Sequence, residues 1–313
     1  ACAFLNHVCG AQMDVAPGRI VYTQFLNGAG GIEADVTVTR LSETAYLVVT
    51  PALTLPADMA WLRRQIGDRF VVLTDVTSAE GVLAVMGPKA RDLLNLVSPD
   101  DFSNETHPFG HAREVEIGMA LARAHRVSYV GELGWEVYVS ADMAGHVFDT
   151  LWQVGQGIGA KLCGLHAMDC CRIEKGFRHF GHDITSEDHV LEAGLGFAVK
   201  LDKPDFIGRD AVLRKKETGL TRRLLQFKLS DPEAMVYHNE PILRDGQIVS
   251  HVTSGAYGHH LGAGIGLGYV PCAGKSAEAV LASDYAIEIA GRRVPVTASL
   301  KPMYDPGSTR VKL

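Results

Sequence analysis

The chain has 313 residues, more than a single hydrophobic core usually supports, so we expect two or three domains. With 47% hydrophobic and 21% charged residues, it lacks the composition of a disordered protein. Thirty Lys and Arg against thirty-six Asp and Glu give a formal net charge of −6. There is no basic cluster, and no apolar run approaches the ~20 residues of a membrane helix, so we expect neither a nucleic-acid nor a membrane partner.

The first two hundred residues predict a mixture of strands and helices. Two β-rich runs flank the turn sequence Asn-Gly-Ala-Gly-Gly at 27–31, which favours a hairpin. The predicted elements are strands at 20–26, 32–40 and 45–50, a helix at 57–66, strands at 70–76 and 81–86, a helix from Pro88, strands at 114–121 and 123–130, and helices at 142–155 and 165–175. This order indicates an α+β arrangement.

From Arg222 the pattern changes to short strands separated by turn residues. We predict these strands at 222–229, 247–253, 265–270, 285–290 and 293–300. The pattern is typical of an all-β domain, barrel or jelly-roll-like. Because charged residues surround Gly219, we divide the chain into domains at 1–220 and 221–313.

Six cysteines form no C-x-x-C pair and are too sparse for a disulfide framework. We therefore expect reduced thiols in a cytoplasmic protein, with the mitochondrial matrix as the alternative. Cys170 and Cys171 adjoin in a predicted helix without a local partner that would form a thiolate, so we expect buried, unreactive side chains. The chain opens on Ala1 and not on Met, and we expect it to be the C-terminal part of a longer polypeptide.

Two other clusters have simple structural explanations. The glycines of the run 262–268 alternate, unlike those of a dinucleotide-binding G-x-G-x-x-G loop, and favour a strand that another segment approaches closely. His179, His182 and Asp183 lie close together in the sequence, and His259 and His260 adjoin, but neither group has enough ligands for zinc. We expect no metal site.

The run Tyr-Val-Gly-Glu-Leu-Gly-Trp-Glu at 129–136 combines an aromatic ring, glycine turns and two carboxylates. Two strand arms would bring Tyr129 and Glu136 together across the turn. A carboxylate beside an aromatic face suits a heterocycle with an amino-amide edge, such as a pterin. From spacing alone, a structural hairpin with a surface glutamate fits equally well.

Six blocks of sequence carry a resemblance to a known family. They are 21–27, 30–36, 128–136, 172–178, 192–198 and the Phe-Ile-Gly-Arg run from Phe206. With these blocks in order, the chain resembles, nearly end to end, the folate-binding family of the glycine-cleavage T-protein. It is most similar to the C-terminal region of sarcosine and dimethylglycine dehydrogenases.

The resemblance implies an α+β fold. Two interleaved α/β-sandwich, ferredoxin-like domains would occupy 1–220, a β-barrel would occupy 221–313, and tetrahydrofolate would lie in a central channel. Family members carry further residues before the segment where this chain begins. The dehydrogenases also carry an N-terminal flavin domain, so FAD is expected only in a domain absent from this chain.

The resemblance also implies which residues bind folate. The family's pterin-binding Tyr and Glu match Tyr129 and Glu136, and its hairpin tyrosine matches Tyr22. From the same motif we take Gly131 and Trp135 as further folate-binding candidates.

The catalytic candidates follow less directly from the resemblance. The resemblance aligns the Asp assigned to one-carbon chemistry with Gln12, whose amide cannot accept a proton as a carboxylate does. Asp14 or Asp35 could take over that role, so all three residues are candidates. The family's folate-tail arginine is replaced by Met168, so we carry over no tail contact.

These expectations combine into one functional prediction. The chain is expected to bind reduced folate as the one-carbon acceptor module of a flavoprotein N-demethylase, with a flavin-containing domain or subunit as partner, and to form 5,10-methylene-tetrahydrofolate. The alternatives are a stand-alone folate-dependent aminomethyl or methyl transferase or demethylase, and a non-catalytic folate-binding regulatory module.

Overall fold

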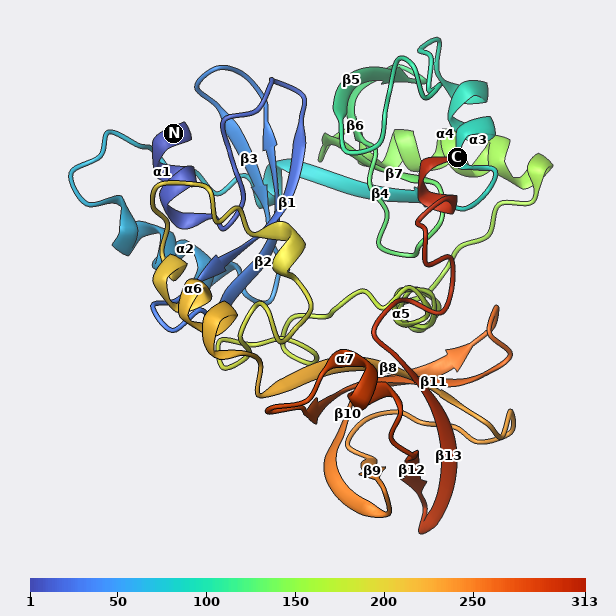
Figure 1. The fold of residues 1–313 in the computed structure, drawn as a ribbon. Helices are drawn as coiled ribbons and strands as arrows, with labels where there is room; N and C mark the ends of the chain where they lie inside the picture. The colour runs from blue at the N-terminus through green and yellow to red at the C-terminus, as the bar shows by residue number, and fades with distance from the viewer.

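Three β-sheets divide the chain into three lobes (Figure 1), and the structure, a computed structural model, describes all residues from 1 to 313. The first lobe contains an antiparallel sheet in the order β1-β2-β3 with helices α1 and α2. Its elements are α1 (Cys2–Val8), β1 (Ile20–Leu26), β2 (Ile32–Arg40), β3 (Tyr46–Val49) and α2 (Leu55–Ile66). Phe25 of β1 stacks on Trp61 of α2 at 5.1 Å between ring centroids, which joins sheet and helix in one core.

The hairpin predicted around residues 27–31 is present. Asn27 closes the turn because its Oδ1 accepts hydrogen bonds from the amides of Ala29 and Gly31. Gly31 is required there, since a Cβ would collide with the carbonyl oxygen of Ser186. The turn is therefore also the place where the first lobe meets the loop after α5.

The second lobe is a four-stranded antiparallel sheet in the order β4-β7-β6-β5, covered on one face by two helices. Its elements are a 3-10 turn (Thr77–Ala79), β4 (Glu80–Met86), α3 (Ala90–Val97), β5 (Ala112–Ile117), β6 (Ala120–His125), β7 (Gly134–Ser140) and α4 (Ala144–Ile158). Trp135 and Val137 of β7 are fully buried against these helices, so the helix-covered face forms the core.

The third lobe is a closed six-stranded barrel in the order β10-β11-β8-β13-β12-β9. Its elements are β8 (Arg222–Leu229), β9 (Pro241–Arg244), β10 (Gln247–Gly258), β11 (Ala263–Pro271), α7 (Ala277–Leu281), β12 (Tyr285–Ile289) and β13 (Arg292–Ser299). The alternating glycines lie in β11, as predicted, and allow close approach: a Cβ on Gly264 would lie 2.7 Å from the carbonyl oxygen of Ala234.

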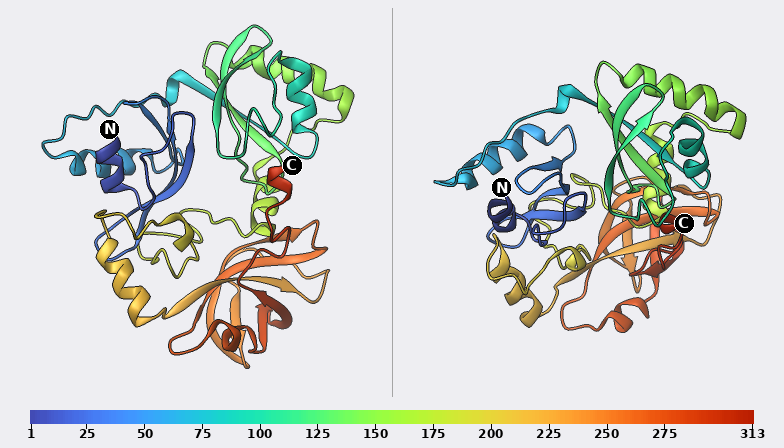
Figure 2. Two further views of the ribbon diagram at one scale, coloured as in Figure 1. Left: turned by 45° about the horizontal axis from the view of Figure 1, so that its top comes forward. Right: turned by 90° about the horizontal axis from the view of Figure 1, so that it is seen from above.

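Helix α5 (Leu165–Glu174) lies between the upper lobes and the barrel (Figures 1 and 2). It is fixed to the barrel by buried polar contacts. The Arg172 guanidinium donates to Ser254 at 2.9 Å, the Glu174 carboxylate accepts from the amides of His260 and Leu261, and Gln226 donates to the last carbonyls of the helix. The remaining elements are short 3-10 turns at Gly196–Ala198 and Arg310–Lys312 and helix α6 (Arg209–Thr218).

The α+β-plus-barrel class predicted from the sequence is confirmed, but several details differ. Residues 70–76 form no strand, and β5 and β6 turn at 118–119 and not at 121–123. Strand β9 and helices α6 and α7 were not predicted. The barrel's first strand begins at Arg222, while the 220/221 division stays a prediction. No helix has the length and apolar character needed to cross a membrane.

Candidate functional site

A half-buried carboxyl group, that of Asp35, lies on the β1–β2 hairpin of the first lobe. Asp35 of β2 is the register partner of Gln24 of β1, and its Oδ1 accepts a hydrogen bond from Gln24 Nε2 at 2.8 Å. Tyr22, two residues before Gln24 on the same strand, also hydrogen-bonds the Asp35 carboxyl. The alternation of strand side chains places all three on one face of the hairpin.

Burial changes the protonation of this carboxyl group. It raises the pKa of Asp35 to about 6, although the bonds from Gln24 and Tyr22 and the positive charge of Arg178 each act to lower it. The oxygen of the same Gln24 amide, Oε1, is buried without a hydrogen-bond partner. Such an unpaired acceptor is costly, so the group beside Asp35 is suited to a ligand that donates a hydrogen bond.

Two aromatic pairs lie around this carboxyl group. Tyr22 stacks on Phe197 with 6.1 Å between centroids, and Phe197 is 70% exposed although it is apolar. Tyr129 stacks on Phe177 at 6.1 Å, and its hydroxyl donates to the Arg178 carbonyl at 2.8 Å. Burial raises the pKa of Tyr129; the charge of Arg172 acts against this, and the charges of Asp183 and then Asp35 act with it.

Glu136 lies on β7, on the sheet face opposite the helices. Its register partner is His125 of β6, and its Oε2 accepts a hydrogen bond from the Tyr138 hydroxyl at 2.7 Å. Burial raises the pKa of Glu136, and the bond from Tyr138 acts in the opposite direction. Tyr129 is not in the facing strand arm, as the hairpin prediction had it, but in the loop between β6 and β7.

The two other residues of the motif lie away from open space. Trp135 is fully buried, donates from Nε1 to His107 at 3.3 Å and packs edge-on against Phe102, so it belongs to the core of the second lobe. Gly131 has φ +75° and lies against the Lys175 side chain, 3.1 Å from where a Cβ would be. The structure therefore gives Trp135 and Gly131 packing and turn roles and brings neither to the aromatic pairs.

Gln12 and Asp14 do not join the Asp35 group either. Both are exposed, and Gln12 Oε1 accepts a hydrogen bond from the Asp14 amide at 3.0 Å. The Asp14 carboxylate pairs with Arg40 at 2.9 Å. Of the three catalytic candidates, only Asp35 is not fully exposed: it is half-buried, beside the predicted folate-binding residue Tyr22.

Sequence reasoning missed three members of the group: Phe177, Arg178 and Phe197. Arg178 donates from Nε to the Ala193 carbonyl and from Nη1 to the Gly176 carbonyl, which fixes its charge near Asp35. The blocks 172–178 and 192–198 contained the signal, because both were part of the family resemblance.

The other sequence clusters have structural roles here. Asp183 is fully buried and accepts a hydrogen bond from Arg172 Nη1 at 2.5 Å, while the rings of His179 and His182 meet edge to face with 4.6 Å between their centroids. No three His, Cys, Asp or Glu side chains are close enough to hold a metal ion. Cys170 and Cys171 are half-buried and not fully buried as expected, and partial burial raises the pKa of both thiols, which disfavours the thiolate.

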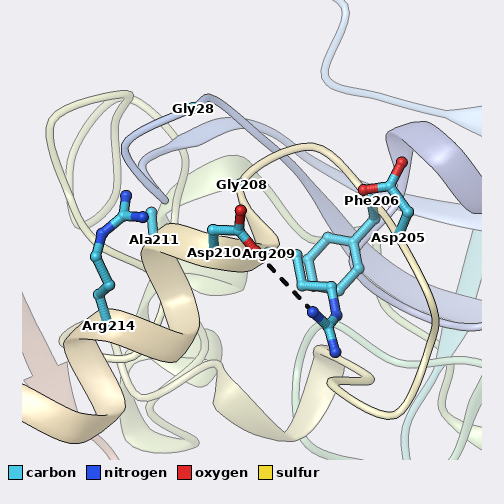
Figure 3. A pocket seen from close by; sticks show the side chains of 8 residues that line it. All are labelled: Gly28, Asp205, Phe206, Gly208, Arg209, Asp210, Ala211 and Arg214. Atoms are coloured by element: carbon cyan, nitrogen blue, oxygen red, sulfur yellow. Dashed lines mark ion pairs between the residues drawn. The ribbon is translucent and has the colours of Figure 1, made fainter.

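An open pocket of about 240 Å³ lies elsewhere, at the start of α6 (Figure 3). Its lining residues are Gly28, Asp205, Phe206, Gly208, Arg209, Asp210, Ala211 and Arg214. Arg209 is 4.0 Å from Asp210 and already donates to the carbonyls of Leu201 and Lys203. The pocket contains none of the site residues, and we assign it no function.

Comparison with known proteins agrees with the fold described above. Residues 1–203 match the family model of the GCVT N-terminal domain, and residues 222–305 match that of the glycine cleavage T-protein C-terminal barrel domain. The crystal structure of the glycine cleavage system aminomethyltransferase T from Bartonella henselae superposes with a TM-score of 0.83 at 25% identity, covering 96% of this chain and 80% of that one.

Two curated relatives are much longer than this chain. It is 43% identical over 303 residues to 4-methylaminobutanoate oxidase (formaldehyde-forming) of Paenarthrobacter nicotinovorans, and 34% identical over 321 residues to human mitochondrial sarcosine dehydrogenase. Each match covers 96% of this chain, but only 36% and 35% of the relative. The chain thus spans about a third of their length. With both family models matched over nearly the whole chain, the chain belongs to the glycine cleavage T-protein family.

Proposed function

We propose that the chain is the tetrahydrofolate-binding, one-carbon acceptor domain of an amine-oxidising flavoprotein, and that it forms 5,10-methylene-tetrahydrofolate. The observation that carries the proposal is Asp35, a half-buried carboxyl group with a pKa of about 6 beside Tyr22, which stacks on the exposed ring of Phe197. The names of the two long relatives support an N-methylated amino acid as the upstream substrate. As partners we propose a flavin-containing domain or subunit, and as location the cytoplasm, with the mitochondrial matrix as alternative.

The residues present fit a reduced folate. A pterin is a flat heterocycle with N–H donors, and the exposed Phe197 ring offers an apolar surface of the kind on which such a ring packs. The unpaired Gln24 Oε1 and the Glu136 carboxylate are acceptors for its donors. Tyr129 would line the same space, as the resemblance suggests.

The mechanism follows from the protonation of Asp35. When bound, tetrahydrofolate supplies the amine nitrogen that accepts the one-carbon unit. A carboxyl group with a pKa of about 6 is poised to give or take a proton near neutral pH, which is the requirement for a general acid–base group. Its ionised form also places a negative charge where an electron-poor carbon must approach. Tyr22 and Gln24 hold the carboxyl group in position by hydrogen bonds.

This assignment changes the expectation attached to Gln12. If Asp35 carries the proton, the exposed Gln12 is no handicap, and transfer to folate does not depend on it. We propose that the product is methylene-tetrahydrofolate when folate is present and that formaldehyde is released when it is absent. Gln12→Asp is then expected to leave the ratio of the two products unchanged.

A stand-alone aminomethyl transferase is the second candidate, and the Bartonella aminomethyltransferase structure favours it. A flavin domain in the natural polypeptide distinguishes the two. A purified natural protein that shows stoichiometric flavin absorbance supports the acceptor-domain proposal, and one without flavin that transfers the aminomethyl group supports the alternative. A non-catalytic folate-binding module would bind folate yet tolerate loss of the Asp35 carboxyl group.

The experiment that tests the proposal separates binding from transfer. Calorimetric titration with tetrahydrofolate should show binding to the parent chain and to Asp35→Asn, but weakened binding to Glu136→Gln. The matched control is Glu114→Gln, an exposed glutamate of β5 in the same sheet. In the natural flavoprotein, Asp35→Asn should shift the products from methylene-tetrahydrofolate towards formaldehyde, and an unchanged ratio would refute the role of Asp35.

A further inference from the structure

The sheet of the second lobe carries a group of polar side chains on the face opposite its helices. Glu136 and Tyr138 are two residues apart on β7, so they lie on the same face of the sheet. Their register partners on β6 are His125 and Arg123. We call these four side chains the β6–β7 block. The folate proposal uses the block only through Glu136, which leaves the other three side chains to be explained.

Within this block, Tyr138 holds the carboxyl group of Glu136. Its hydroxyl donates to Glu136 Oε2 at 2.7 Å, and Oε1 accepts no hydrogen bond from the protein. Burial, and next the charge of Glu136, raise the pKa of Tyr138, so the hydroxyl keeps its proton and stays a donor. A phenol has only one proton to donate, so this bond leaves Oε1 as the acceptor for a ligand.

The Tyr138 ring is itself held on both sides. The His125 ring lies 4.2 Å away between centroids, and the Arg123 guanidinium lies 5.6 Å from the Tyr138 centroid. Arg123 is fixed in turn, because its Nη2 donates to both oxygens of the Glu80 carboxylate at 3.0 Å. Its Nε donates to His125 Nε2 at 3.1 Å, so the His125 ring is neutral and carries its proton on Nδ1.

The surroundings of Glu136 favour its neutral form, apart from this one hydroxyl. Burial raises the pKa of Glu136, and the hydrogen bond from Tyr138 is the contact that lowers it. Burial, and next the charge of Arg123, lower the pKa of His125 to about 3, so this facing residue supplies no positive charge near neutral pH. Arg123 is paired with a carboxylate of its own, and β4 places only Ala84 opposite Glu136.

We propose that Tyr138 is a positioning residue of the folate site, whose hydroxyl fixes the Glu136 carboxylate and leaves Oε1 to accept an N–H of the pterin. The bond also keeps Glu136 ionised, which an acceptor of two N–H donors requires. A carboxylate already held at one oxygen loses less freedom when a ligand binds. This inference rests on the proposed function, because it takes Glu136 as the pterin acceptor.

Anaerobic calorimetric titration of the natural protein with tetrahydrofolate between pH 5.5 and 8.5 tests the proposal. Affinity should fall as pH falls through the pKa of Glu136, because a protonated carboxyl group is a poorer acceptor. Tyr138→Phe keeps the ring and removes the bond that lowers this pKa. The fall should therefore begin about half a pH unit or more higher, and affinity at pH 8 should be about three- to tenfold weaker. An unmoved pH profile would overturn the proposal.

Two further variants separate the possible causes of a loss. Tyr285→Phe is the matched control, since it removes another buried hydroxyl, one that donates to the Val280 carbonyl at 3.0 Å in the barrel, and it should change neither affinity nor profile. An equal loss in both variants would overturn the positioning role. If Glu136→Gln binds folate as tightly as the parent, the proposed function of Glu136 fails. Weakened binding by Glu136→Gln with an unmoved Tyr138→Phe profile refutes the role of Tyr138 alone.

Carbon-13 NMR of labelled glutamate carboxyl groups gives a second measurement that needs no folate. The Glu136 signal, assigned by its loss in Glu136→Gln, should titrate at higher pH in Tyr138→Phe than in the parent. Incorporating 3-fluorotyrosine in place of Tyr138 keeps the hydroxyl and makes it a stronger donor, so the same signal should titrate at lower pH. This variant hardly changes the packing of the ring. Titration curves that coincide in parent and fluorinated protein would overturn the proposal.

Discussion

Replacing Asp35 with asparagine should make the protein more stable and less active. The folded-state pKa of Asp35, about 6, lies above its ordinary value of 3.8, so the folded protein holds this proton more tightly than the unfolded chain does. At pH 7 the carboxyl group is ionised in both states, and its burial costs free energy in the folded state alone. An asparagine amide carries no charge, so the substitution removes this cost.

The expected gain in stability follows from the size of the pKa shift of Asp35. About two pKa units at roughly 1.4 kcal/mol each correspond to about 2–3 kcal/mol at pH 7. Because the pKa of Asp35 is raised in the folded state, the direction of the pH dependence of stability is also fixed. The parent should lose stability as pH rises from about 4 to about 6, and the difference between Asp35→Asn and the parent should grow over that range and be small at pH 4.

The assay is urea denaturation followed by tryptophan fluorescence at pH 4, 5.5 and 7. Asp149→Asn, an exposed position on α4 without a recorded partner, is the control and should change stability by less than about 0.5 kcal/mol. Transfer to folate should fall by about 10²–10⁴ in Asp35→Asn. A variant less stable than the parent at pH 7, or a difference that does not vary with pH, would refute the reasoning.

Three further substitutions test other parts of the structure. Glu136→Gln removes a charged hydrogen-bond partner and should weaken tetrahydrofolate binding by about 1.5–3 kcal/mol, measured by calorimetry; unchanged affinity contradicts its role. Arg178→Gln removes a positive charge that lowers the pKa of Asp35, so the pH profile of one-carbon transfer should move to higher pH, and an unmoved profile would show that the two groups are not coupled. Gly31→Ala should destabilise the fold by about 2 kcal/mol or more in thermal unfolding because its Cβ meets the Ser186 carbonyl, whereas Gly28→Ala, with nothing within 4 Å, should be nearly neutral; equal effects would argue against the close contact.

Local sequence signals predicted most of the fold. Strands β1 and β2 and the barrel strands alternate apolar residues between clear turn glycines, so their positions follow from periodicity. Strand β9 was missed because it has only four residues and begins at Pro241. Residues 70–76 have the sequence pattern of a strand but pair with no other strand, because the pattern of one segment does not say which strand it pairs with.

The site was less accessible to sequence reasoning. Tyr22, Tyr129 and Glu136 were identified through the family resemblance, and Asp35 entered only as one of three catalytic candidates. The degree of burial separates Asp35 from the other two catalytic candidates, and burial depends on the tertiary fold. The neighbours of Asp35 are side chains of β1 and Arg178, which lies more than a hundred residues later in the chain. Trp135 illustrates the same difficulty, because a motif position does not reveal which sheet face it occupies, and Trp135 lies on the face buried against the helices.

The polar attachment of α5 to the barrel links the third lobe to the group of residues around Asp35. Phe177 and Arg178 follow α5 by only three and four residues, and the position of that helix depends on Ser254, Gln226 and the amides that Glu174 binds. Small changes inside the barrel would therefore move the Tyr129–Phe177 pair and the Arg178 charge together. Over evolutionary time, substitutions in the barrel offer a way to shift this group while every residue in it is kept.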